Sequence, residues 1–190
     1  HRALCELRGP DGGLYVPFRK PNLTKQEIAA LLEMPFNQCV AKVINLLFNT
    51  QLSAWDIDFS VGRNPVRLHS MGHRITVGEC WHNPEGEISY LVRKIANRIR
   101  VKGTEEDLGD WPQIGVRIAV LFGIFGQLQR VNGEPLAKPV DVSVMSGDFI
   151  APMAAWYARI LGLPVGNIVC CCNENSSIWE LFHHGEFRTG

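Results

Sequence analysis

A segment in the last third of the chain changes its hydrophobic pattern in the order strand, turn, helix, strand. Residues 140–144 alternate valine with polar residues, the period-two pattern of a strand. Ser146-Gly147-Asp148 interrupts this alternation, and residues 151–161 follow with good helix formers at helical spacing. After a glycine and a proline, the almost wholly apolar run 167–172 is typical of a strand buried on both faces. The pattern predicts a βαβ unit, whose strand-to-helix turn is where such folds place an anion.

The N-terminal part predicts a turn, a short strand and a capped helix. Asp11-Gly12-Gly13 is a tight-turn sequence, and the short apolar run 14–16 after it is stopped by a proline. Thr24 and Glu27 have the spacing of a capping box, which predicts a helix through Leu32.

Several further elements are expected between these two ends. The pattern predicts helices over Pro35–Phe48 and Ile114–Leu128, and an amphipathic helix that runs through Ile99. It predicts short strands over Ile57–Val61, Val66–His69 and Arg74–Gly78. The segment Lys102–Pro112 is rich in glycine, acidic residues and proline, and is expected to be a loop or linker.

Composition excludes several classes of function. The 190 residues are 46% hydrophobic with a formal net charge of zero, enough for one substantial core and without the excess charge of a nucleic-acid or anionic-membrane binder. A local cluster of basic residues shares a predicted helix with a stripe of apolar residues, so we interpret the basic residues as the solvated face of that helix. The cluster comprises Arg93, Lys94, Arg98, Arg100 and Lys102. No apolar stretch of membrane-spanning length and no signal peptide is recognised.

Cysteine and histidine residues do not form a metal-ligand pattern. Cys170, Cys171 and Cys172 are consecutive on a predicted strand, so their side chains alternate between faces and the three cannot hold one metal ion. His183 and His184 are adjacent at the end of a predicted helix, where a favourable interaction with the helix dipole explains them. We expect no metal site and a reduced, cytoplasmic protein.

Two groups of residues resemble the threonine synthases, enzymes of the tryptophan synthase beta-like fold type II that use pyridoxal phosphate (PLP). Residues 9–17, GPDGGLYVP, are similar to the DGGLYVP signature of that family. Residues 145–151, MSGDFIA, resemble its SGNFGN turn, and Gly162-Leu163-Pro164 and 172–175, CNEN, follow as GLP and TNEN do there. The resemblance implies that Ser146, Gly147, Asp148 and Phe149 form a degenerate cofactor-phosphate turn. It places Asn173 and Asn175 beside the cofactor.

The segment 79–84, ECWHNP, is similar to the family's ELFHGP, which leads to the lysine that binds PLP as a Schiff base. Counting from His82 as the family does, the lysine position is occupied by Ser89. A hydroxyl cannot condense with the cofactor aldehyde, so this departure removes the family's chemistry. His82 itself is a candidate acid–base residue, although a hydrogen-bonded imidazole in a turn is the favoured interpretation.

Other departures from the family point the same way. The second glycine of the phosphate turn is replaced by Ile150, whose side chain would crowd an anion. Asp148 replaces an asparagine and places a carboxylate where a phosphate would lie, although an acidic residue also suits a helix start. The family has many more residues between Ile99 and Ile114 than this chain does.

The predicted fold class is α/β: a reduced PLP fold-type-II-like architecture, with a small mixed sheet flanked by helices and a C-terminal βαβ unit. Residues 1–101 are expected to hold the N-terminal arm, helices and small sheet, 102–112 the linker, and 113–190 a helix with the βαβ unit. The function favoured is a non-catalytic threonine synthase-like binding or oligomerisation module without a cofactor.

The alternative is a PLP-dependent lyase of the threonine synthase type, acting on O-phosphohomoserine. It requires Lys94 or Lys102 to reach the cofactor, or a longer chain. A third possibility is an anion site at 146–148 for a small phosphorylated or carboxylated ligand. Because so much of a larger fold is absent, apolar faces should be exposed, and we expect a homodimer without nucleic-acid or membrane partners.

Overall fold

The computed structural model describes residues 9–13, 15, 21–61, 66–80, 110–133, 135–147, 149–174 and 177–186. Its helices are α2 (Lys25–Glu33), α3 (Phe36–Phe48), α4 (Ala54–Val61), α6 (Asp110–Asn132), α7 (Ile150–Ile160) and α8 (Ser177–His184). Its strands are β1 (Arg67–Gly72), β2 (Ile75–Glu79), β3 (Val140–Met145) and β4 (Val165–Cys171). The helix expected through Ile99 and the cluster of basic residues near it lie outside the described residues.

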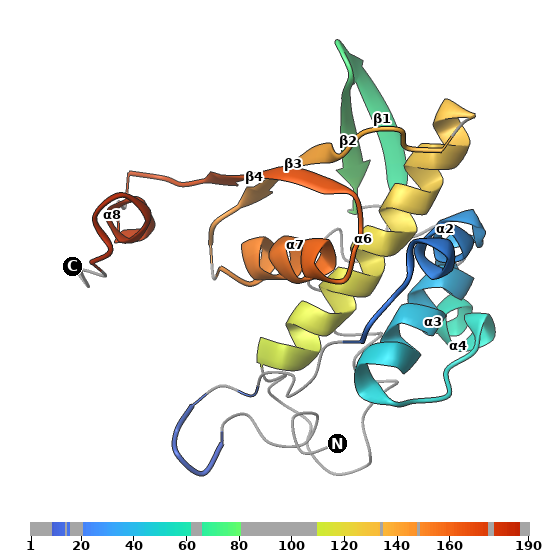
Figure 1. Cartoon of the computed structure of the whole chain (residues 1–190), viewed down its shortest axis with the longest axis horizontal. Helices are drawn as coiled ribbons and strands as arrows, with labels where there is room; N and C mark the ends of the chain where they lie inside the picture. Colours follow the sequence, from blue (N-terminus) through green and yellow to red (C-terminus); the bar gives the residue numbers. More distant parts are fainter. Residues whose placement is uncertain are drawn as a thin grey trace.

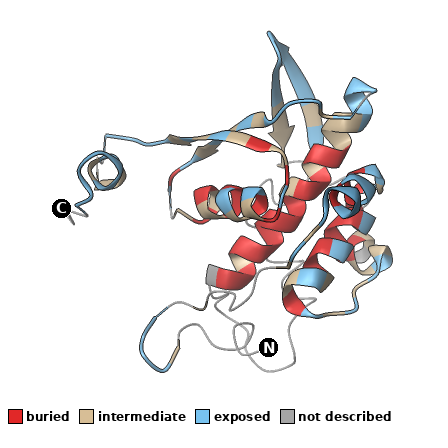
Figure 2. Ribbon diagram, in the orientation of Figure 1, coloured by how far each residue is buried: buried red, intermediate tan, exposed pale blue. Residues whose placement is uncertain are grey.

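The long helix α6 runs through the middle of the molecule, with α2, α3 and α4 on one side and the β3–α7–β4 unit on the other (Figure 1). Most of its residues are buried, as the red ribbon in Figure 2 shows. One hydrophobic core joins residues from all these helices, so α6 connects the two ends of the sequence through a single packed interior.

Small residues on α6 let the neighbouring helices approach closely. A Cβ atom added to Gly126 would lie 2.7 Å from the backbone oxygen of Leu32, at the end of α2. A Cβ atom added to Gly123 would meet the ring of Phe36 on α3 at 2.6 Å. The packing of α2 and α3 against α6 therefore depends on these glycines.

The capped N-terminal helix is confirmed. The backbone N–H of Thr24 donates to Glu27 Oε2 over 2.8 Å, and the N–H of Glu27 donates to Thr24 Oγ1 over 3.2 Å. These two reciprocal bonds are the capping box, and α2 follows from Lys25 to Glu33. The predicted helix at Pro35–Phe48 is also confirmed as α3, with Pro35 as its N-cap residue.

The expected strand over Ile57–Val61 is wrong: these residues belong to α4. Apolar residues at 57, 59 and 61 have the alternation of a strand. Ser53, however, is a helix start signal, and the prediction did not take it into account. The N–H and the hydroxyl of Ser53 each donate to Asp56 Oδ2 over 2.8 Å. The start signal therefore outweighs the period-two pattern.

The next two predicted strands form an antiparallel hairpin, β1–β2, which projects from the body. The hairpin turn lies at His73 and Arg74, which have positive φ angles of 47° and 64°. Strand β1 extends to Gly72, beyond the predicted end at His69. Positive φ at both central residues is the geometry of a tight hairpin turn whose twist matches the strands.

The predicted βαβ unit is confirmed as β3–α7–β4, with β3 and β4 parallel. The small mixed sheet takes the form of two separate two-stranded sheets in the described part of the chain, one antiparallel and one parallel. The expectation that residues 167–172 are buried on both faces is wrong, because β4 alternates between half-buried and exposed side chains after Val165. Only the face that packs on α7 is covered by described residues.

Helix α6 is longer than expected and begins at Asp110, so residues 110–112 are helical rather than part of a loop. By length and composition alone, Trp111–Asn132 is apolar enough to cross a membrane, although no such stretch was recognised in the sequence. Since 61% of its most apolar window is buried inside the structure, it serves here as the central core helix.

Candidate functional site

The turn between β3 and α7 holds three of the residues that the sequence singled out. Ser146 is buried, and its backbone N–H donates to the carbonyl oxygen of Cys171 over 3.0 Å. Gly147 has a φ angle of 26°, and Phe149, the N-cap residue of α7, lies in the left-handed region at 62°. The N–H of Phe149 donates to the carbonyl oxygen of Ser146, which closes the turn.

The beginning of α7 offers few donors to an anion. Ile150, its first residue, is only 6% exposed and belongs to the hydrophobic core. Pro152, the third residue, has no backbone N–H. Phe149 supplies no side-chain capping bond. Since a phosphate site at a helix start relies on free backbone N–H groups, Pro152 removes one of the donors that such a site would use.

Of the other predicted site residues, the structure describes only some. Asn173 is exposed and lies just beyond the end of β4, at the same edge of the parallel pair as Ser146. The structure thus brings Ser146, Gly147, Phe149 and Asn173 to one end of the β3–β4 sheet. Asp148, Asn175, His82, Ser89, Lys94 and Lys102 lie outside the described residues, so their roles stay predictions.

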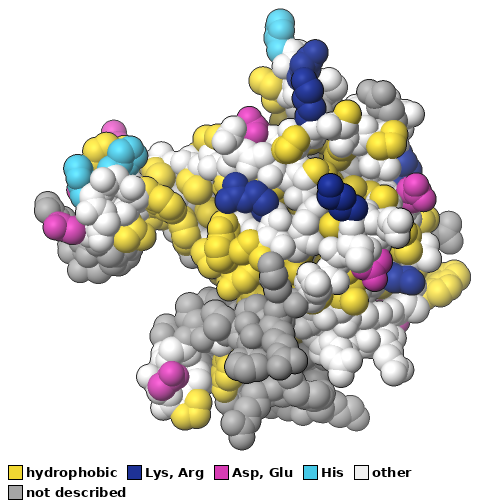
Figure 3. Space-filling view, viewed as in Figure 1, with side chains coloured by type: hydrophobic (Ala, Val, Ile, Leu, Met, Phe, Trp, Pro, Cys, Tyr) yellow, Lys and Arg dark blue, Asp and Glu magenta, His cyan; other side chains and the backbone are white. Residues whose placement is uncertain are grey.

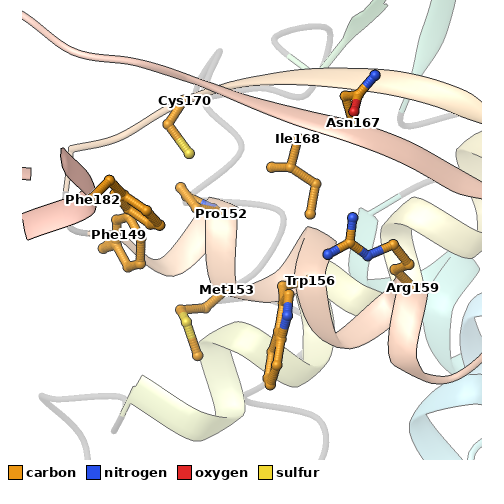
Figure 4. A pocket seen from close by; sticks show the side chains of 9 residues that line it. All are labelled: Phe149, Pro152, Met153, Trp156, Arg159, Asn167, Ile168, Cys170 and Phe182. Atoms are coloured by element: carbon orange, nitrogen blue, oxygen red, sulfur yellow. The ribbon is translucent and has the colours of Figure 1, made fainter. Parts of the chain in front are cut away.

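An open cavity of about 400 Å³ lies beside this turn, between α7, β4 and α8 (Figure 4). Its wall is mostly apolar and includes Phe149, Met153, Trp156 and Phe182, whose side chains surround it, with Arg159 as the charged residue. This cavity was not predicted from the sequence. The spacing of Phe149, Met153 and Trp156, which places them on one helical face, was the available signal.

The cavity belongs to a wider exposed apolar surface on the C-terminal unit, visible between α8 and the body in Figure 3. Its large exposed side chains come from α7 and α8: Trp156, Trp179, Leu181 and Phe182. Helix α8 has no buried residue, stands away from the body (Figure 1), and contacts it through the rings of Phe182 and Phe149, whose centroids are 5.9 Å apart. We call this the C-terminal apolar surface.

The three consecutive cysteines do not converge. The sulfur of Cys171 lies 3.2 Å from Ser143 Oγ, while Cys170 lines the cavity. Partial burial, and then the neighbouring thiols of Cys172 and Cys171, raise the pKa of Cys170. In the part of the chain that the structure describes, no group of three or more His, Cys, Asp or Glu side chains could hold a metal ion.

The adjacent histidines of α8 both contact Trp179. The ring of His183 stacks on Trp179, with centroids 4.1 Å apart, and its Nδ1 lies 3.0 Å from the carbonyl oxygen of Trp179. His184 Nε2 lies 3.8 Å from Glu180 Oε2. The ring of His184 also meets Trp179 edge-on, with centroids 5.5 Å apart, so the two imidazoles share this neighbour.

Comparison with known proteins identifies relatives at both levels, sequence and fold. Residues 1–63 match the family "Threonine synthase N terminus". The chain is 29% identical over 79 residues to threonine synthase of Methylobacillus glycogenes. The aligned residues make up 42% of the chain and 16% of that protein. The chain is 26% identical over 78 residues to mouse threonine synthase-like 1, and this covers 41% of the chain and 10% of that protein.

The fold is similar to the crystal structure of threonine synthase from Escherichia coli, with a TM-score of 0.79 and 14% sequence identity. This similarity covers 100% of the chain and 64% of the solved one. The chain thus spans less than two thirds of that protein, and its sequence matches span a sixth or less of the relatives' lengths. Taken together, the N-terminal family match, the sequence relatives and the shared fold show that the chain is similar to the threonine synthases in its N-terminal sequence and in its fold.

Proposed function

We propose that this threonine synthase-like protein is not catalytic and acts as a binding or oligomerisation module. The observation that carries the proposal is the start of α7, where Ile150 is buried and Pro152 lacks an N–H. In the family that the sequence resembles, this turn would cradle the cofactor phosphate. The missing N–H of Pro152 removes one of the donors that an anion at this helix start would use.

The sequence supports the same conclusion from a second position. Counting by the family motif places Ser89 where the Schiff-base lysine would be. Because only an amine condenses with the cofactor aldehyde, serine cannot substitute. The proposal therefore includes no cofactor, and the lyase reaction on O-phosphohomoserine is the alternative that the test below separates from it.

The C-terminal apolar surface supports the binding part of the proposal. Phe182 is 66% exposed and Trp156 is 41% exposed, and both line the cavity between α7, β4 and α8. An eight-residue helix such as α8 is marginal in water without tertiary contacts, so it gains most from a partner that covers it. We propose that a second copy of the chain is this partner and that the protein works in a reducing, cytoplasmic setting.

Cofactor binding is tested with the full chain and added PLP. We expect no Schiff-base absorbance band, and borohydride reduction followed by peptide mapping should show only scattered, substoichiometric labelling of lysines. Stoichiometric labelling of one lysine, lost in Lys94→Arg or Lys102→Arg, would establish the alternative. Both variants keep a positive charge and serve as controls for each other.

Oligomeric state is tested separately by sedimentation velocity across a range of concentrations. Phe182→Glu should shift the dimer towards monomer, since it places a charge in the C-terminal apolar surface. Trp55→Glu is the matched control, because Trp55 is 74% exposed but lies on α4. A wild-type chain that stays monomeric, or equal effects of the two variants, would contradict the second-copy proposal.

A further inference from the structure

A second cavity, of about 450 Å³, lies between α3, α4 and α6, on elements that do not contribute to the β3–α7 turn. Phe36 and Ala54 form part of its apolar wall. Five polar side chains also line it, namely Asn37, Gln38, Asp58, Gln127 and Arg130. Its volume lies in the range typical of small-molecule sites, roughly 300–1,000 Å³.

Two opposite charges border this cavity. Asp58, from α4, accepts a hydrogen bond from Nδ2 of Asn37, whose side chain is buried in α3. Arg130, from α6, uses Nη1 to donate to the carbonyl oxygens of Leu32 and Met34 over 3.2 Å and 2.8 Å. Among the contacts of the described residues, Asp58 and Arg130 form no ion pair with each other. Each charge is thus held by its own neighbours while both border the same space.

Gln127 adds an acceptor that needs a donor. Its Nε2 lies 3.4 Å from the carbonyl oxygen of Val66, which fixes the orientation of the side-chain amide. Its Oε1 is buried and has no hydrogen-bond donor among the residues that the structure describes. Turning the amide over would bring two carbonyl oxygens together at Val66, so the amide cannot relieve this by flipping. A buried acceptor without a donor is rare, and a group bound in the cavity could supply the donor.

We propose that this cavity binds a small zwitterion of the α-amino acid class. The ligand's ammonium group donates to the carboxylate of Asp58 and to Oε1 of Gln127. Its carboxylate accepts from the guanidinium of Arg130, whose planar array of donors suits a carboxylate. Phe36 and Ala54 contact its side chain. This proposal does not depend on whether the chain has lost catalysis.

The arrangement favours a zwitterion over other occupants. A lone water molecule could satisfy Gln127 Oε1 but would not match the two charges. An anion alone would face Asp58, and a cation alone would face Arg130, so each would meet a like charge across the cavity. A ligand that carries both charges meets an opposite charge at each end.

The test uses the full chain in calorimetric titrations with a panel of free L-α-amino acids. Each amino acid that binds is compared with the amine that lacks its carboxylate and with the acid that lacks its amine. Because a hydrogen bond to a charged group is lost in each analogue, we expect each to bind about tenfold or more weakly. Absence of binding by every amino acid at millimolar concentration, or equal binding of the analogues, would overturn the proposal.

Variants then locate the site. Asp58→Asn keeps an acceptor for Asn37 but removes the charge, so it should weaken binding about tenfold or more while the chain stays folded. Arg130→Gln should do the same, with its melting temperature followed because Arg130 also holds the end of α2. Arg159→Gln, on α7, is the matched control and should leave binding unchanged. An unchanged affinity in Asp58→Asn would overturn the assignment.

Discussion

Asp141 on β3 accepts a hydrogen bond from the backbone N–H of Asn167 on β4 over 2.7 Å, through Oδ1. Its other oxygen lies 3.3 Å from the side-chain nitrogen of Asn167. The contact lies where the register of the parallel pair shifts, between Val140 and Val142. A side chain therefore replaces a backbone partner at the point where the ladder is irregular.

Removing this carboxylate should weaken the parallel pair. We expect Asp141→Ala to lower the free energy of unfolding by about 1 kcal/mol, since a hydrogen bond from a backbone N–H to a charged acceptor is lost at an exposed site. Urea unfolding followed by circular dichroism measures the change. Ser143→Ala, at the next outward-facing position of β3, is the control and should have a smaller effect.

Glu27 gives the capping box a pH dependence. Hydrogen bonds from the backbone N–H and then the hydroxyl of Thr24 hold the pKa of Glu27 below its ordinary value. The carboxylate therefore stabilises the fold above its unfolded-state pKa, and this contribution is lost as the pH falls through the lowered, folded-state pKa.

The corresponding experiment compares Glu27→Gln with the wild type by urea unfolding at a series of pH values. The wild type should be more stable near neutral pH, and the difference should shrink towards acid pH. Glu33→Gln, at the other end of α2, controls for the loss of one charge. A difference that does not change with pH would show that the capping carboxylate is not responsible.

Gly126 tests the close approach of α2 to α6. Alanine in an exposed helix would gain about 1 kcal/mol over glycine. At Gly126 the new Cβ atom would lie 2.7 Å from the backbone oxygen of Leu32, and overpacking costs typically 1–3 kcal/mol. Because backbone cannot move aside as a flexible side chain does, we expect Gly126→Ala to lower the melting temperature.

The control for this prediction is Gly78→Ala. A Cβ atom at Gly78 meets its nearest side-chain atom, of Ile124, at the ordinary contact distance of 3.6 Å. Its melting temperature should therefore change less than that of Gly126→Ala. If both variants melted alike, the close helix contact would not be the cause.

Thiol reactivity should separate the buried cysteines from the exposed ones. Burial raises the pKa of Cys39 to about 12 and that of Cys80 to about 11, so both remain protonated at neutral pH. Cys171 and Cys172 are exposed. Alkylation with iodoacetamide at neutral pH, mapped by mass spectrometry, should label these two first and Cys39 only after unfolding. Early labelling of Cys39 would show that the α3–α6 interface opens in the native state.

The elements that carried both a periodic pattern and an end signal were predicted well. The capping box of Thr24 and Glu27 identified α2, and the alternating valines identified β3. For α4, the alternation of apolar residues was misleading because the Ser53–Asp56 start signal was not weighed against it. Burial of β4 was overestimated for a different reason, since an apolar strand does not encode how many neighbours cover it.

The candidate site was predictable only in its local part. The order of Ser146, Gly147 and Phe149 in the sequence places them in one turn, and the parallel pairing brings Asn173 to the same edge. The second cavity, between α3, α4 and α6, could not be predicted from local sequence order. Asp58 and Arg130 are far apart in the sequence and belong to helices with no shared motif, so only the packing of α3, α4 and α6 brings them together.

The central position of α6 has a consequence for how the chain can be divided. The segment that matches the family's N-terminal region ends at residue 63, yet the apolar faces of its helices are closed by α6, which begins at Asp110. The segment matched by the family model is consequently not expected to fold on its own. A fragment that stops before α6 would leave the buried side of α3 in water, and the helices at the beginning of the chain can acquire their native packing only after synthesis has passed Asn132.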